Sequence, residues 1–472
     1  MSYTQLHERF KQIGDLNHAL GVLSWDDAAM MPVGGGKARS ESMATLSGMA
    51  HELVSEPVLG EWLQNAEQEG LDTWQRANVR EMRREWELAR VIPGDLVVAS
   101  SKAASTCEQA WRKLRAENDF PGVAPLLEEV VRLTRERAEC LAEASGVSPY
   151  DALLDQYEPG LKQADFAGMF SELAGFLPRF VDGVIARQPA SRPIAGPFPI
   201  ENQAALADRL MRTLGFDFER GRLDTSHHPF CGGDPDDTRI TTRYNTDDFL
   251  ESLFAVLHET GHALYEQGLP ADWRRQPVGA AGGMALHESQ SLLMEMQACR
   301  SPEFLSYAAP VIRECLGATD DSGSWSLGNL LRLATKVERG FIRVEADEAT
   351  YPLHVILRYE LESALVDGAL DVVDLPEAWN EKMERYLGLS TAGDDANGCM
   401  QDVHWYAGLI GYFPTYTLGA LAAAQIFTAA RDAIGDVHGE LARGDFGRLV
   451  AWLRENVHGR GRVKPSMELI TE

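Results

Sequence analysis

The sequence is poor in cysteine, in long apolar runs and in basic residues, and each shortage excludes a class of protein. Its six cysteines are scattered over 472 residues without a C-x-x-C pair, which is typical of reduced thiols inside a cell and not of a disulfide framework. No run approaches the ~18 consecutive apolar residues that a membrane-spanning helix needs. The first residues also lack the basic and apolar regions of a signal peptide. We therefore expect a cytoplasmic protein with no membrane partner.

Basic residues are outnumbered by acidic ones, 44 to 71, which gives a formal net charge of −27. A surface of this sign repels the phosphates of nucleic acids, so we expect no nucleic-acid partner. The hydrophobic content of 44% is ordinary for a globular protein.

Apolar residues recur every three or four positions along the first half, with charged faces between them. This spacing predicts helices at 3–23, 37–55, 73–91, 93–117, 124–146 and 162–187. The proline-rich stretch 188–199 is interpreted as a loop within one body, and a linker between domains is the alternative. We predict a single helical domain over residues 1–472, with a helical half at 1–190 and a catalytic half at 200–472.

The second half contains the motif H-E-x-x-H at residues 258–262. Positions four apart lie on one face of a helix, so His258 and His262 can bind one metal ion. Glu259 is rotated by about 100° and can take a proton from a metal-bound water. A chance match occurs in about one or two such chains per hundred. However, cap-type residues at 245–248 and the helical spacing of the leucines favour a real helix, and the motif predicts a zinc hydrolase.

Two imidazoles leave a catalytic zinc site incomplete, because such sites have three protein ligands and one open position. Glu288, on a helix predicted for 284–299, is the preferred third ligand. His287 is a rival, but it lies about 100° around that helix, and a solvated acidic residue is the other interpretation of Glu288. With this ligand set Glu259 acts as the general base, passing the proton of the water to the departing amine.

A strand is predicted for 237–244, directly before the motif helix, because β-branched residues alternate there with polar ones. Such a strand can hold an extended peptide by strand addition. The alternative is a structural hairpin whose arginines pair with surface acids.

The stretch 398–419 combines polar aromatic residues with glycines. An oxyanion needs a hydrogen-bond donor besides the metal, and His404 and Tyr416 are the candidate catalytic residues. Tyr412 is a further candidate. The alternative is that these rings pack in the core with their polar ends satisfied.

The chain resembles the carboxypeptidase Taq family of zinc metallocarboxypeptidases. Short blocks of the family type occur in order along the catalytic half. They are His228-Pro229-Phe230, Asp237-x-Arg239-x-Thr241, His258-Glu259-x-x-His262, His287-Glu288-Ser289-Gln290, Ile342-Arg343-x-x-Ala346-Asp347 and Gly398-x-x-Gln401-Asp402-x-His404-Trp405. One departure is the segment 291–296, which is more apolar than the family pattern.

The resemblance implies a mainly α fold. It would be a large two-lobed helical body with a deep groove and a small β element beside the H-E-x-x-H helix. It also implies His258, His262 and Glu288 as metal ligands and Glu259 as general base. The expected activity is removal of C-terminal residues from peptides with broad specificity. One Zn²⁺ per chain is expected, which Co²⁺ can replace, and the chain is expected to form a homodimer.

A carboxypeptidase also needs a cation for the terminal carboxylate of its substrate, and the planar fork of arginine suits it. Arg343 and Arg239 are the candidates in family blocks, with Arg243 a weaker third. Each can instead form a structural pair with an acidic residue of the chain. His228 and Tyr412 complete the predicted substrate-binding set.

Two alternative functions remain open. A related helical zinc endopeptidase or dipeptidyl carboxypeptidase would share the metal centre. A non-catalytic, metal-containing peptide-binding protein would need neither Glu259 nor an open metal position.

Overall fold

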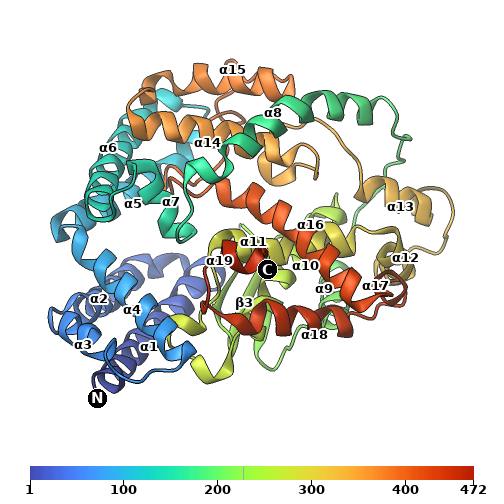
Figure 1. Cartoon of the computed structure of the whole chain (residues 1–472). Coiled ribbons are helices and arrows are strands. Elements are labelled where there is room, and N and C mark those ends of the chain that lie inside the picture. Colours follow the sequence, from blue (N-terminus) through green and yellow to red (C-terminus); the bar gives the residue numbers. More distant parts are fainter. Residues whose placement is uncertain (227, 472) are drawn as a thin grey trace. The chain divides into compact units, whose positions relative to one another are not determined.

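Helices make up most of the computed structural model, which describes residues 1–226 and 228–471 (Figure 1). The six helices predicted in the first half are present. They are α1 (Ser2–Ala29), α2 (Gly36–Ser55), α4 (Thr73–Val91), α5 (Gly94–Ala116), α6 (Phe120–Ser145) and α8 (Gln163–Ile185). Two short helices, α3 (Val58–Ala66) and α7 (Pro149–Tyr157), were not predicted. Each has nine residues, and so short a segment shows too few turns for its periodicity to stand out.

The second half continues the helical pattern and adds one small sheet. Its helices are α9 (Ile200–Leu214), α10 (Phe249–Gly268), α11 (Met284–Leu292), α12 (Pro302–Leu316), α13 (Leu327–Ala334), α14 (Tyr351–Asp367), α15 (Leu375–Leu387), α16 (Pro414–Ile434), α17 (Val437–Leu441), α18 (Gly447–Asn456) and α19 (Ser466–Thr471). The predicted mainly α fold with a small β element is confirmed. Within the described ranges, no helix combines the length and apolar character that crossing a bilayer requires.

The chain forms two compact units, each built from segments that are distant in sequence. The first unit contains Met1–Ala89, Ala190–Thr335 and Gly419–Glu472, and the second contains Arg90–Pro189 and Lys336–Leu418. Within the proline-rich stretch 188–199 the chain continues from the second unit into the first. The single-domain organisation stays a prediction.

In the first unit, α10 lies in the main hydrophobic core. Its Leu253, Leu257 and Leu264 are buried with residues of α9, α12 and α16, and burying a leucine side chain contributes about 1.5–3 kcal/mol. The helix begins as expected, because the Asp248 carboxylate accepts a hydrogen bond from the backbone N–H of Leu250. Burial of the apolar stripe therefore fixes the rotation of α10, and with it the direction of its polar side chains.

The sheet packs on the same helix. Its strands β1 (Gly221–Thr225), β2 (Phe230–Asp234) and β3 (Asp237–Thr242) have the order β1-β3-β2. Ile240 of β3 is buried in a cluster with Val256 and Ala263 of α10. The strand prediction is confirmed, although β3 ends two residues earlier than expected. The prediction that an extended peptide pairs with β3 was wrong, because β1 and β2 occupy both hydrogen-bonding edges of this strand.

Candidate metal centre

Helices α10 and α11 approach each other closely at a glycine. A Cβ atom on Gly261 would lie 2.5 Å from the backbone oxygen of Gln290 and 2.6 Å from the Cα of Ser291. Contacts this short are not tolerated between non-bonded atoms, so the approach requires glycine at this position. It brings the turn of α10 that contains the histidines against the turn of α11 that contains Glu288.

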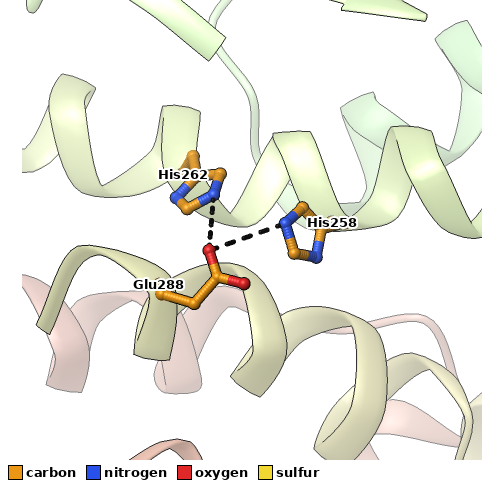
Figure 2. Close-up of side chains that lie close together, drawn as sticks. All are labelled: His258, His262 and Glu288. Atoms are coloured by element: carbon orange, nitrogen blue, oxygen red, sulfur yellow. Dashed lines mark ion pairs between the residues drawn. The ribbon is translucent and has the colours of Figure 1, made fainter. Parts of the chain in front are cut away.

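His258, His262 and Glu288 point toward one another from these two helices (Figure 2). The Glu288 Oε2 atom lies 3.3 Å from His262 Nε2 and 3.9 Å from His258 Nε2, and the three ligand atoms lie within 4.8 Å of one another. Tetrahedral zinc with bonds of about 2.0–2.1 Å separates its ligand atoms by about 3.3 Å. The group is therefore of the right size and chemistry to hold such an ion.

The second nitrogen of each imidazole is held by an acceptor. His262 Nδ1 lies 3.1 Å from the backbone oxygen of His287, and His258 Nδ1 lies 2.9 Å from Glu295 Oε2. A carbonyl oxygen and a carboxylate only accept hydrogen bonds, so both Nδ1 atoms donate. In the neutral form of each imidazole the lone pair is therefore on Nε2 and is directed at the common point, as in zinc sites of other proteins.

Glu259 stands beside this group and is buried. Within the described part of the chain, its Oε2 atom is buried without a hydrogen-bond partner. Burial is the largest influence on its carboxyl group and, together with Glu288 and against the opposing effect of His258, raises its pKa to about 7. A buried oxygen of this kind can exchange a proton near neutral pH with a water molecule placed next to it.

The electrostatics of the cluster favour a cation. Burial by itself lowers the pKa of His258, but Glu288, Glu295 and Glu259 outweigh it and raise that pKa to about 10. His262 shows the opposite result, because burial and His287 lower its pKa to about 4. Three carboxylates around two imidazoles thus attract positive charge. In the protein without a metal ion, a proton on His258 provides that charge.

His287, the rival ligand, turns away from the centre. Its ring stacks on that of His262 with centroids 4.6 Å apart, and its Nε2 atom lies 2.8 Å from Glu266 Oε1.

Glu295 and Arg300 are site residues that the sequence analysis missed. Arg300 donates to Glu295 Oε1 from Nη2 at 2.7 Å and from Nε at 3.2 Å. Burial raises the pKa of Glu295, but Arg300 and His258 outweigh it and lower that pKa to about 2. A signal was available, because Glu295 follows Glu288 by seven positions, two helical turns, and is the only acid in the apolar run 291–296.

The predicted oxyanion donors are in the second unit. His404 Nε2 lies 3.1 Å from the Tyr416 hydroxyl, and the Tyr412 ring is 5.7 Å from that of His404. The structure thus brings these three residues together. Asp402 lies next to them, with Oδ1 3.9 Å from His404 Nδ1.

The arginines predicted to bind a substrate carboxylate are already paired. Arg343 is buried and donates from Nη2 to Asp402 Oδ1 at 2.9 Å. Arg239 makes two bonds to Asp237, of 2.7 and 2.8 Å. Both forks therefore form the structural pairs that were the alternative, and a substrate role for them stays a prediction.

The weaker candidate, Arg243, is paired with Glu251. His228 is exposed just before β2, with Nδ1 2.8 Å from the backbone oxygen of Pro229.

Comparisons with known proteins give one consistent result. The profile of the family described as "Carboxypeptidase Taq (M32) metallopeptidase" matches residues 5–472. Thermostable carboxypeptidase 1 of Thermus thermophilus is 42% identical, over 95% of this chain and 90% of the relative. Thermostable carboxypeptidase 1 of Pyrococcus furiosus is 34% identical, over 99% and 93%.

Solved structures agree. Metallocarboxypeptidase 1 of Trypanosoma cruzi superposes with a TM-score of 0.96 at 40% identity, covering 99% of this chain and 95% of that one. The M32 carboxypeptidase of Deinococcus radiodurans gives a TM-score of 0.94 at 36% identity, covering 99% and 94%.

Proposed function

Because this chain belongs to the carboxypeptidase Taq (M32) family of metallopeptidases, we propose that it removes single residues from the C-termini of peptides by zinc-dependent hydrolysis, with broad specificity. Curated relatives that match nearly the whole chain are named carboxypeptidases.

His258, His262 and Glu288 are the proposed ligands of one Zn²⁺, which Co²⁺ can replace. Two neutral imidazoles and one carboxylate form a donor set of catalytic zinc sites, and three protein ligands leave one position open. When bound, zinc polarises the scissile carbonyl and lowers the pKa of a coordinated water towards neutrality.

Glu259 is the proposed general base. Its unpartnered Oε2 atom takes the proton of the attacking water and returns it to the leaving amine. A pKa of about 7 suits both steps, because the carboxyl group is then close to balance between its two protonation states.

His404 and Tyr416 are proposed to donate hydrogen bonds to the oxyanion. Their mutual hydrogen bond holds the two side chains together, and when His404 Nε2 donates in it the Tyr416 hydroxyl can donate in turn to the oxyanion.

The observation that carries the proposal is the convergence of the two Nε2 atoms and the Glu288 carboxylate beside an unpartnered glutamate. The test combines metal analysis of the purified protein with mass spectrometry of a synthetic peptide over time. We expect one zinc per chain and a ladder of single-residue losses from the C-terminus. Two-residue steps or internal cuts would instead support the dipeptidyl carboxypeptidase or the endopeptidase, and a panel of peptides with different last residues tests the breadth of specificity.

The remaining proposals concern the state of the protein. We propose a cytoplasmic homodimer that binds peptides and neither nucleic acid nor membrane. Light scattering coupled to size-exclusion chromatography measures the mass, for which we expect twice the 52.1 kDa of one chain.

A further inference from the structure

Arg300 is linked to the proposed metal ligand His258 through one intervening side chain. Its guanidinium donates two hydrogen bonds to Glu295 Oε1, and the other carboxylate oxygen of Glu295 accepts from His258 Nδ1. Glu295 is buried and uses both oxygens in this way. The three side chains thus form an unbroken chain of charge-assisted hydrogen bonds that ends at a ligand.

A change of helix type makes this arrangement possible. The α-helix α11 continues as a π-helix over η4 (Leu293–Cys299), and the Arg300 backbone N–H donates to the Glu295 carbonyl, five residues earlier. In an α-helix, residues five apart point about 140° away from each other. The i→i+5 bonding of a π-helix places them one above the other. The π segment therefore puts the Arg300 side chain over the Glu295 carboxylate.

Arg300 is itself fixed from two further sides. Its Nη1 donates to the backbone oxygen of Ala334 at 2.5 Å. Its guanidinium lies over the ring of Phe254, 3.8 Å from the centroid, and Phe254 is one turn before His258 on α10. A side chain with this many contacts is suited to holding a neighbour in one orientation.

The two imidazoles differ in what they need from such a neighbour. The partner of His262 is a backbone oxygen within α11, which the helix already holds in place. The partner of His258 is a side-chain carboxylate with three rotatable bonds, which the helix alone does not orient. Of the two imidazoles, His258 is therefore the one whose partner a further residue has to orient.

We propose that Arg300 is a positioning residue for metal binding, which orients Glu295 so that His258 Nε2 faces Glu288. This inference rests on the proposed metal site, since it explains how one ligand of that site is directed. Its effect on zinc passes through Glu295 and not through overall folding.

The test is a double-mutant cycle on zinc affinity, measured by competition with a chromogenic chelator. Changes in the hydrogen-bond partner of a ligand cost about 10- to 100-fold in metal affinity. We expect Glu295→Gln to weaken zinc binding within this range and Arg300→Gln, one step further away, to weaken it about 10-fold. Because Arg300 acts through Glu295, the double variant should bind zinc about as weakly as Glu295→Gln alone.

Arg274→Gln is the matched control. Arg274 also lies in the first unit and makes the same kinds of bond, a fork on Asp236 and a bond to the backbone oxygen of Leu269, but away from the cluster. It should lower stability without changing zinc affinity. Arg300→Lys keeps the positive charge but lacks the planar fork, so it should bind zinc with an intermediate affinity. If Arg300→Gln does not fold, the lysine variant provides the test in its place.

Unchanged zinc affinity in the Arg300 variants would overturn the proposal, and so would additive losses in the cycle. Either result leaves the metal site itself intact. If instead the wild type binds no zinc, or His258→Ala binds it as tightly as the wild type, the proposed function fails first.

Discussion

Two buried glutamates, one in each unit, have the same raised pKa and opposite surroundings. Burial raises the pKa of Glu259 and of Glu362 to about 7. Glu362 nevertheless accepts hydrogen bonds from the Tyr150 hydroxyl at 2.6 Å and from Trp405 Nε1 at 3.0 Å. Glu259 Oε2 has no partner in the described chain. A perturbed pKa alone therefore does not identify a functional carboxyl group, whereas the state of its hydrogen bonds separates the two.

The charged clusters of the two units also differ in whether the chain supplies partners for the carboxylates. Asp402 lies between the buried Arg343 and Arg358, which outweigh the effect of desolvation and hold its pKa well below the ordinary value. In the proposed metal centre the carboxylates face imidazoles, and Arg300 pairs with Glu295. In the first arrangement two guanidinium groups of the chain balance the charge of the carboxylate, whereas the carboxylates of the second attract a cation.

The largest expected effect is on catalysis, and it separates the two glutamates. Glu259→Gln removes the proposed general base and should lower kcat/KM by about 10²–10⁴-fold. Zinc content and melting temperature should stay near those of the wild type, because the amide has the same shape. Glu362→Gln should change kcat/KM by no more than a few-fold. Equal losses of kcat/KM in the two variants would show that the absence of a hydrogen-bond partner does not distinguish a catalytic glutamate from a structural one.

Next in size is the effect on stability of breaking the second cluster. Asp402→Asn leaves two buried guanidinium groups without their carboxylate, and removing one partner of a buried ion pair costs about 3–5 kcal/mol. Glu288→Gln, a change of the same kind in the metal centre, should abolish zinc binding with little effect on the unfolding free energy of the metal-free protein. Chemical denaturation of both metal-free variants measures the contrast. A stable Asp402→Asn protein would mean that the arginines are neutralised elsewhere.

The third effect is the pH dependence due to Glu362. Its pKa is about 7 in the folded protein and 4.5 in the unfolded chain, so folding favours the protonated form. The associated stability is fully present below pH 4.5 and is lost as pH rises through 7, by about 3 kcal/mol in all. Glu362→Gln removes this dependence. The stability of the wild type relative to the variant should therefore fall between pH 4.5 and 8, and a difference that is constant over this range would contradict the assigned pKa.

The sequence predicted those features of the fold and of the candidate site that depend on residues close together in the chain. The helix α10, its cap at Asp248 and the pair of histidines on one face follow from spacing alone. Glu288 was predicted because it lies on a helix with a clear start. The pairing of Arg343 with Asp402 joins positions 59 apart, and nothing in the spacing distinguishes Asp402 from the other acids. The place of Arg300 over Glu295 depends on a π-helix, which hydrophobic periodicity does not reveal.

The smallest effect concerns the proton that the metal-free centre holds. Glu288 and Glu295 outweigh burial and keep His258 protonated at neutral pH, with a pKa of about 10. Zinc needs the neutral imidazole, so its binding must release that proton. Affinity should therefore rise with pH by up to tenfold per unit, about 1.4 kcal/mol, while His258 remains protonated in the metal-free state. Titration calorimetry in buffers of different ionisation enthalpy measures the protons released, and we expect about one from His258 at pH 7. A value near zero would mean that the carboxylates do not hold a proton in the metal-free centre, and that other groups of the chain balance their charge, as the arginines balance that of Asp402 in the second unit.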